Sequence, residues 1–326
     1  MSAVRLTAAV CTRDRPGLLA RALESLVGQT VPPAEILVVD NAPGSGATLT
    51  LVAEHFPSVR YLVEPIPGLD FARNRALESA AYEVLAFLDD DAVAAPGWAE
   101  ALRRVFEDDP GVAVCTGRIE PLGVDTPGQR LFEANGGFSR GAERIRLPDD
   151  AGRPLHGRRA PLIAWAISVG CGCSYAVRRD AARALGGFDE ALDLGPALPG
   201  GGDHDLLWRA LRAGHAVVYE PSALAWHEHR REVAAACDQI VGHQRAVLAF
   251  LGKHLVSGSG GMRPALAGYT GWRLAKPGVR LMRRAIGQDP LPARVLLRMW
   301  WNCWLGLVTY PRARRLARAR REGYAA

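Results

Sequence analysis

Over roughly the first third of the chain, short apolar segments alternate with segments whose apolar residues recur at helical spacing. The apolar segments are 6–11, 36–39, 59–63 and 84–88, and the helical ones are 18–26, 72–80 and 98–106. Strands this apolar, separated by amphipathic helices, predict an α/β fold with a mostly parallel central sheet flanked by helices. In such a sheet, ligands bind in the crevice beyond the carboxyl ends of the strands.

The remaining regions of the chain are less regular. Residues 121–168 predict an irregular insertion that serves as a lid or an acceptor wall. Short strands at 170–177, 217–219 and 223–226, and a helix that starts at Asp203, predict the end of the α/β domain. We therefore expect a domain at 1–231, made of two halves at 1–118 and 119–231. A basic helical extension follows at 232–326.

Three polar clusters follow predicted strands and should meet at one edge of the sheet. They are 12–15, 40–41 and 89–91. In the third cluster, Asp89, Asp90 and Asp91 repel one another at neutral pH, and a divalent cation relieves that repulsion. Carboxylates that leave the coordination shell incomplete suit Mg²⁺ or Mn²⁺ holding a diphosphate. The alternative, a solvated acidic turn, is disfavoured because the cluster ends a core strand.

Two further positions suit a nucleotide. Asp40 ends a strand and can accept hydrogen bonds from a base or ribose, although a strand-ending Asp often caps a turn instead. Arg73 and Asn74 place a cation and an amide near a helix start. Arg73 can meet a phosphate, and the alternative is a salt bridge to a neighbouring acid.

Candidates for proton transfer and metal ligation lie later in the chain. Asp203 follows three glycines at a helix start, where an ionised carboxylate is favoured and can serve as a general base. The alternative is an ordinary helix cap. Asp205 points elsewhere on the helix and is placed to bond Arg209. His227 and His229 face the same way if the chain is extended, and a neutral imidazole can ligate a metal.

The net charge of +6 is distributed unevenly. From Leu255 onward there are fourteen Lys and Arg but only two acids, so the preceding residues carry a net charge of −6. A basic tail on an acidic body indicates an anionic lipid surface rather than nucleic acid, for which no recognition helix is evident. Tryptophans beside an arginine cluster suit a helix lying in the membrane interface, and their packing onto the main domain is the alternative.

The N-terminal residues lack the pattern of a secretory signal, and six scattered cysteines suit a reducing compartment. We therefore expect a cytoplasmic protein that can associate with the inner face of the membrane.

Taken in order, these motifs resemble those of family 2 of the glycosyltransferases, the inverting enzymes with the fold called GT-A. The motifs are 10–15 (VCTRDR), 38–41 (VVDN), 68–74 (GLDFARN), 87–91 (FLDDD), 186–190 (GGFDE), 202–206 (GDHDL) and 219–221 (YEP), with His227 after them. The resemblance covers roughly residues 5–230, and it implies a nucleotide-binding half at 1–118 and an acceptor-binding half at 119–231. Each motif is permissive alone, but their order is specific.

The resemblance implies a nucleotide-diphosphate sugar as donor, a divalent Mg²⁺ or Mn²⁺ ion, and an acceptor hydroxyl that the sequence does not identify. It places Thr12 and Asp40 around the nucleoside, Arg73 near the phosphates, and Asp89 and Asp90 near the ribose. Arg13, Asp14 and Asn74 belong to the same donor-binding set. Asp91 and His227 are the implied metal ligands, and Asp203 matches the family's catalytic base.

The chain departs from the family pattern at two places. Gly202 stands where the family has a glutamate, so either Asp203 alone is the base or the register shifts to Asp205. The first motif lacks an aromatic residue that could stack on the base of the nucleotide.

Two rival functions remain. One is a nucleotidyltransferase, for which residues 12–17 lack a lysine and a glycine-rich loop. The other is a non-catalytic nucleotide-sugar or lipid-binding module.

Overall fold

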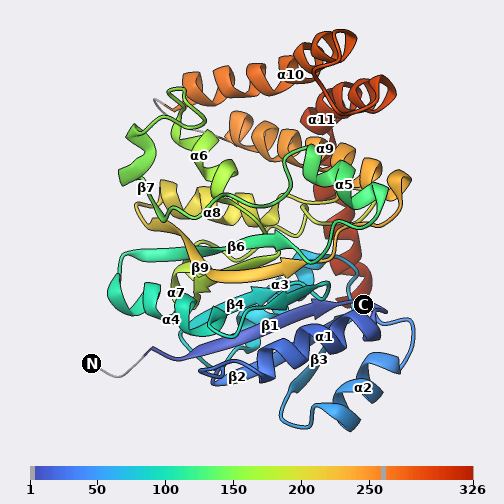
Figure 1. Ribbon diagram of the computed structural model, residues 1–326. Helices are drawn as coiled ribbons and strands as arrows, with labels where there is room; N and C mark the ends of the chain where they lie inside the picture. The colour runs from blue at the N-terminus through green and yellow to red at the C-terminus, as the bar shows by residue number, and fades with distance from the viewer. Residues whose placement is uncertain (1–3, 258–261, 326) are drawn as a thin grey trace.

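The computed structural model describes residues 4–257 and 262–325, and Figure 1 shows a central sheet with helices packed around it. The strands are β1 (Leu6–Thr12), β2 (Glu35–Asn41), β3 (Arg60–Glu64), β4 (Val84–Leu88), β5 (Ala92–Ala94), β6 (Val112–Pro121), β7 (Ile145–Leu147), β8 (Ser174–Arg178) and β9 (Ala216–His227). Their order is β3-β2-β1-β4-β8-β6-β9-β5, and β7 pairs with β9. The helices of the α/β part are α1 (Pro16–Val27), α2 (Ala47–His55), α3 (Leu69–Ser79), α4 (Trp98–Asp108), α5 (Pro127–Ala134), the 3-10 turn η1 (Asp149–Gly152), α6 (Leu162–Val169), α7 (Arg179–Ala184) and α8 (Gly202–Arg212).

Strands β3, β2, β1 and β4 run parallel, as the sequence predicts. Alternate residues of these strands enter two different core clusters. Val10 and Val38 pack with α1 and α4, whereas Ala9 and Val39 pack with α3 and α8. Helices therefore cover both faces, and the predicted α/β fold is confirmed.

The second half of the sheet is mixed rather than parallel. β8 runs antiparallel to β4 and β6, and β5 and β7 run antiparallel to β9, while β6 and β9 are parallel. The two short strands predicted at 217–219 and 223–226 form one strand, β9, with an irregularity opposite Gly117 and Arg118. The strand predicted at 170–177 begins only at Ser174, and the four residues before it form a loop in which Gly172 is partly exposed.

The helices α9 (Val233–Ser257), α10 (Arg263–Ala285) and α11 (Ala293–Ala325) confirm the predicted helical C-terminal region. Figure 1 shows them gathered on one side of the sheet, with the end of α11 returning towards β1. Phe250 of α9 and Cys303 of α11 belong to the same core cluster as residues of α3 and α8. These helices therefore share a hydrophobic core with the α/β part. Within the described ranges, no helix combines the length and apolarity needed to cross a bilayer.

Candidate functional site

A cleft of about 680 Å³ lies at the carboxyl ends of β1 and β4. It is the crevice that the fold predicts for a ligand. Among the predicted site residues, those that line it are Thr12, Arg13, Arg73, Asp89, Asp90, Asp91, Asp203 and His227. A second hollow of about 690 Å³ lies against α4, near Arg144 and Glu220, and none of the predicted site residues lines it.

The carboxylate cluster after β4 is held by specific partners. Asp90 accepts a hydrogen bond from the Thr12 hydroxyl at 2.8 Å and from the Arg15 guanidinium at 3.1 Å. Asp91 faces His227, with 3.3 Å between Oδ1 and the imidazole Nε2. Its other oxygen lies 3.6 Å from Arg15 and 3.8 Å from Arg230. The cluster is thus bounded by cations on several sides, and Asp89 is the member with the least compensation.

The three carboxyl groups titrate differently because their surroundings differ. Burial raises the pKa of Asp89 to about 7, and the charge of Asp91 adds to the shift. Burial also raises the pKa of Asp90, against the opposing charge of Arg15. Burial also acts to raise the pKa of Asp91, but the neighbouring His227, Arg230 and Arg15 outweigh burial and lower the pKa of that carboxyl. Asp91 is therefore the carboxylate most firmly held in its ionised form.

The arrangement of Asp91 and His227 fits a divalent cation. Adjacent ligands of an octahedral ion with bonds of about 2.1 Å are about 3 Å apart. The observed separation of 3.3 Å is close to that spacing. Among the described residues, no three His, Cys, Asp or Glu side chains are grouped so as to hold a metal by themselves. The protein would supply two ligands, which matches ions that are completed by water and substrate phosphates.

Arg73 lies at the floor of the cleft and is 5% exposed. Its guanidinium pairs with Asp70 at 2.9 Å and with Asp193 at 3.4 Å, so the salt bridge that the sequence left as an alternative is present. A Cβ at Gly172 would meet Arg73 at 2.9 Å and Asp203 at 3.3 Å. The Arg73 guanidinium and the Asp203 carboxylate, the candidate base, therefore both lie close to the backbone at Gly172.

Asp203 occupies the first turn of α8 and lines the cleft. Its carboxylate lies 2.9 Å from Nδ1 of His204. Burial would raise the pKa of Asp203, but the charge and hydrogen bond of His204, followed by the charge of Arg73, hold it below its ordinary value. The group is therefore an ionised carboxylate at neutral pH, which is the form that accepts a proton.

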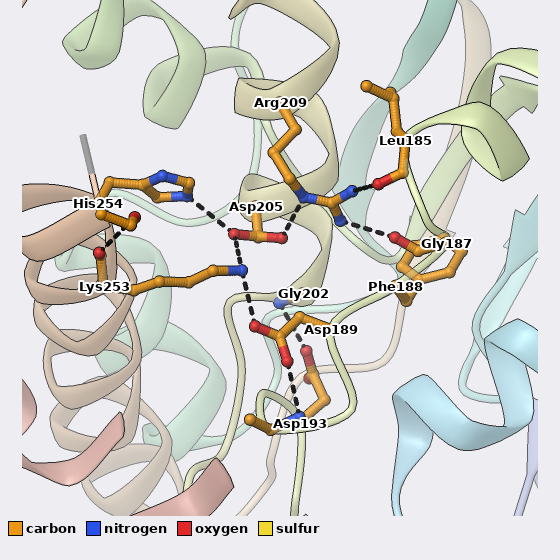
Figure 2. A network of polar contacts seen from close by, with 12 residues as sticks. Leu185, Gly187, Phe188, Asp189, Asp193, Gly202, Asp205, Arg209, Lys253 and His254 are labelled. Carbon is orange, nitrogen blue, oxygen red and sulfur yellow. Dashed lines mark hydrogen bonds and ion pairs between the residues drawn. The ribbon is translucent and has the colours of Figure 1, made fainter. Parts of the chain in front are cut away.

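Asp205 lies two residues further along α8 and points into the protein, where it is fully buried. Figure 2 shows its carboxylate enclosed by Arg209 at 2.6 Å, Lys253 at 2.5 Å and His254 at 2.8 Å. The predicted contact with Arg209 is present. Both oxygens have cationic or imidazole partners, and Asp205 does not line the cleft. These contacts disfavour Asp205 as the proton acceptor.

Three predicted donor-binding residues do not line the cleft. Asp14 accepts a hydrogen bond from the backbone of Gly44. Asp40 is fully buried beneath the Tyr61 hydroxyl, which donates to it at 2.8 Å. Asn74 exchanges two hydrogen bonds with the backbone of Phe188 and so ties α3 to the loop before α8. One oxygen of the Asp40 carboxylate, Oδ1, has no hydrogen-bond partner among the described residues. The donor-binding roles of Asp14, Asp40 and Asn74 stay predictions.

Several cleft residues escaped the sequence analysis. The residues concerned are Arg140, Arg230, Gln239, His243, Arg273 and Arg320. Most come from the insertion or the C-terminal helices, the regions expected to contact an acceptor. Burial and the charge of His204 lower the pKa of His243 to about 4, so it presents a neutral imidazole. No local motif distinguishes these residues from the many other arginines of the chain.

The chain belongs to glycosyl transferase family 2, whose sequence model matches residues 7–186, more than half of its length. The succinoglycan biosynthesis protein ExoM of Rhizobium meliloti (strain 1021) is 30% identical over 253 residues, which cover 75% of this chain and 69% of that protein. The pre-mycofactocin glycosyltransferase of Mycobacterium tuberculosis is 29% identical over 234 residues, or 70% of this chain. That match spans 43% of the relative, less than half of its length.

A solved structure has a similar fold. It is a mannosyltransferase from Pyrobaculum calidifontis in complex with GDP-Man and Mn²⁺. The two structures superpose with a TM-score of 0.60 at 19% sequence identity, covering 95% of this chain and 87% of that one. At this identity the likeness establishes the GT-A fold.

Proposed function

We propose that the protein is an inverting glycosyltransferase that moves a sugar from a nucleotide-diphosphate sugar to an acceptor hydroxyl, with Asp203 as general base. The observation that carries the proposal is the position of Asp203. Its ionised carboxylate opens into the cleft that the Asp89–Asp91 cluster also lines, beside Arg73. Family membership and the donor bound to the structural relative support the same donor class.

In the proposed mechanism, Asp203 removes the proton from the acceptor hydroxyl while the oxygen attacks the anomeric carbon. The bond between that carbon and the phosphate oxygen breaks, and the diphosphate leaves with the electron pair. Arg15 and Arg230 lie 3.6 and 3.8 Å from the Asp91 carboxylate, and Arg73 lines the same cleft. These cations stabilise the charge that develops on the leaving group. A divalent cation held by Asp91 and His227 would supply further neutralisation of the diphosphate.

Donor hydrolysis tests the proposal directly. The protein is incubated with UDP-, GDP- and dTDP-sugars, with Mn²⁺ or with a chelator, and free nucleotide diphosphate is measured. Metal-dependent release from one donor is expected and identifies the nucleotide. If no donor is hydrolysed and no nucleotide binds, the proposal fails. Donor binding without turnover, even when candidate acceptors are supplied, would favour the non-catalytic binding module.

The role of Asp203 is tested by Asp203→Asn. The amide keeps the shape of the side chain but cannot accept the proton, so turnover is expected to fall by about 10²–10⁴-fold while donor affinity is kept. Asp238→Asn, which alters an exposed acid on α9, is the matched control and should leave turnover unchanged. An Asp203→Asn variant that turned over like the wild type would remove Asp203 from the mechanism.

We further propose that α11 rests on an anionic lipid surface. Leu297, Trp301, Trp304 and Val308 recur at helical spacing on α11, and each is half or more exposed. The opposite face of the helix, with Leu296, Met299 and Cys303, is buried. Exposed arginines continue the apolar stripe at both ends, at Arg294, Arg312 and Arg315. An apolar stripe with tryptophans and flanking cations is typical of a helix that lies in the membrane interface.

Vesicle flotation of the full chain tests this surface. Trp301→Ser combined with Trp304→Ser should weaken binding to vesicles that contain phosphatidylglycerol. Val256→Ser, which removes an 85% exposed apolar side chain of α9 outside the stripe, is the control. If the double variant floats with vesicles as well as the control does, the stripe is not the membrane contact.

A further inference from the structure

A continuous chain of side chains runs from the carboxylate cluster into the insertion. Asp91 Oδ1 lies 3.3 Å from Nε2 of His227, and Nδ1 of His227 lies 2.9 Å from Nδ1 of His229. Nε2 of His229 then lies 2.7 Å from the Glu133 carboxylate on α5. Both imidazoles are buried, and the ring of Phe138 packs edge-on against each of them. The rings are therefore fixed in orientation.

Two neutral imidazoles carry two N–H groups, so they can donate in only two of the three contacts. The contacts between the two histidines and at Glu133 have hydrogen-bond geometry, whereas that between His227 and Asp91 is a 3.3 Å approach of an imidazole nitrogen to a carboxylate oxygen. The longest contact is the one between His227 and Asp91, whereas that between His229 and Glu133 is the shortest. The hydrogens are thus assigned to the contacts between the histidines and at Glu133.

We infer that Glu133 and His229 are positioning residues that fix the tautomer of His227 for metal ligation. Glu133 accepts the Nε2 hydrogen of His229, so Nδ1 of His229 is left as an acceptor. That nitrogen accepts the Nδ1 hydrogen of His227, and the Nε2 lone pair of His227 is then directed at Asp91. A lone pair facing a carboxylate oxygen is unfavourable without a cation between them. Metal-bound histidines are commonly oriented in this way through their second nitrogen.

The fold around Glu133 holds its carboxylate in place. Helix α5 begins with a capping box at Thr126, whose hydroxyl also donates to the carbonyl of Arg231 at 2.8 Å. A Cβ at Gly128 would lie 2.4 Å from the same carbonyl, so the helix packs directly on the segment that follows His229. A Cβ at Gly137 would lie 2.4 Å from the Glu133 carboxylate. The glycine, which has a φ of 47°, leaves room for that group.

The inference rests on the proposed function, because it assumes a cation at Asp91 and His227. Mn²⁺ is titrated into the full chain by electron paramagnetic resonance, with and without saturating GDP or UDP. Glu133→Gln, whose amide can either donate or accept, should weaken Mn²⁺ binding by about 10–100-fold. Glu143→Gln, which alters an exposed acid of the same insertion, should bind Mn²⁺ like the wild type.

The outcomes separate the two proposals. If the wild type binds no Mn²⁺ under any condition, the proposed metal site fails. If Glu133→Gln binds Mn²⁺ as tightly as the wild type, the positioning role fails while the metal site stands. A merely structural role would lower the melting temperature and weaken nucleotide binding in chelator, and neither change is expected for Glu133→Gln.

Nitrogen-15 shifts of the histidine rings test the tautomer in the wild type, without any variant or activity. One proton lies between the two Nδ1 atoms. The inference requires it on His227, with an unprotonated Nδ1 on His229. A protonated Nδ1 on His229 would overturn the inference.

Discussion

The buried carboxylate of Asp205 joins the helix that carries Asp203 to the C-terminal helices. Asp205→Asn removes its charge while keeping its size. Lys253 and His254 of α9 and Arg209 of α8 all contact this carboxylate (Figure 2). Removing one partner of a buried ion pair costs about 3–5 kcal/mol, because the remaining charge stays buried without compensation.

The contacts that remain in Asp205→Asn place its expected loss of stability near the lower limit of that range. Lys253 keeps an ion pair with Asp189 at 2.6 Å, and Arg209 keeps the carbonyls of Leu185 and Gly187 at 2.6 and 2.7 Å. Among the described residues, His254 keeps no comparable partner, because its buried Nδ1 has no hydrogen bond to any of them. We therefore expect Asp205→Asn to lower the free energy of unfolding by about 3 kcal/mol.

Equilibrium unfolding in guanidinium chloride, followed by tryptophan fluorescence, measures this loss. Asp238→Asn is the matched control, because it breaks an ion pair of 2.6 Å between α9 and α11 whose side chains are 66% and 52% exposed. Exposed pairs contribute about 1 kcal/mol or less. If the two variants lose the same stability, the buried network does not anchor α8 and the reasoning is wrong.

Two further predictions concern stability. Gly202→Ala would place a Cβ 1.9 Å from the Asp70 carboxylate, so it should destabilise the protein by about 1–3 kcal/mol in thermal melts. Gly17→Ala, whose Cβ would meet no described residue within 4 Å, should not destabilise it. His254, Arg209 and Lys253 outweigh burial and lower the pKa of Asp205, so its contribution to stability is present above the unfolded pKa of about 3.9 and is lost as the pH falls below it. Unfolding measured from pH 7 to pH 3 should show this loss in the wild type and a shallower dependence in Asp205→Asn; equal slopes would contradict the assignment.

The sequence was sufficient to predict which residues meet at the sheet edge where this depends only on their position along a strand. Asp89–Asp91 end a buried strand, and Thr12 ends the neighbouring one, so the parallel register brings them to one edge. The direction in which a side chain points from a helix was harder to predict from the sequence. Asp203 and Asp205 are about 200° apart around a helix, so only one of them can face the cleft, and the register follows from the tertiary packing of α8.

The same limit explains Asn74 and the acceptor wall. Asn74 follows Arg73 directly, yet a helical rotation of about 100° turns it to the loop at Phe188. Arg140 and Arg273 reach the cleft from an irregular insertion and from a C-terminal helix. Nothing local in the sequence fixes the path of either region, so their arrival at the site depends on packing between distant segments.

The Asp70 carboxylate lies directly against the backbone of Gly202, although more than a hundred residues separate the two along the chain. The Asp70 carboxylate fills the space that any side chain at position 202 would need. A relative that carries a glutamate at position 202 must therefore have a smaller or displaced group at position 70. The arrangement of acids around the helix that carries Asp203 therefore depends on both positions, because a side chain fits at position 202 only where the group at position 70 leaves room for it.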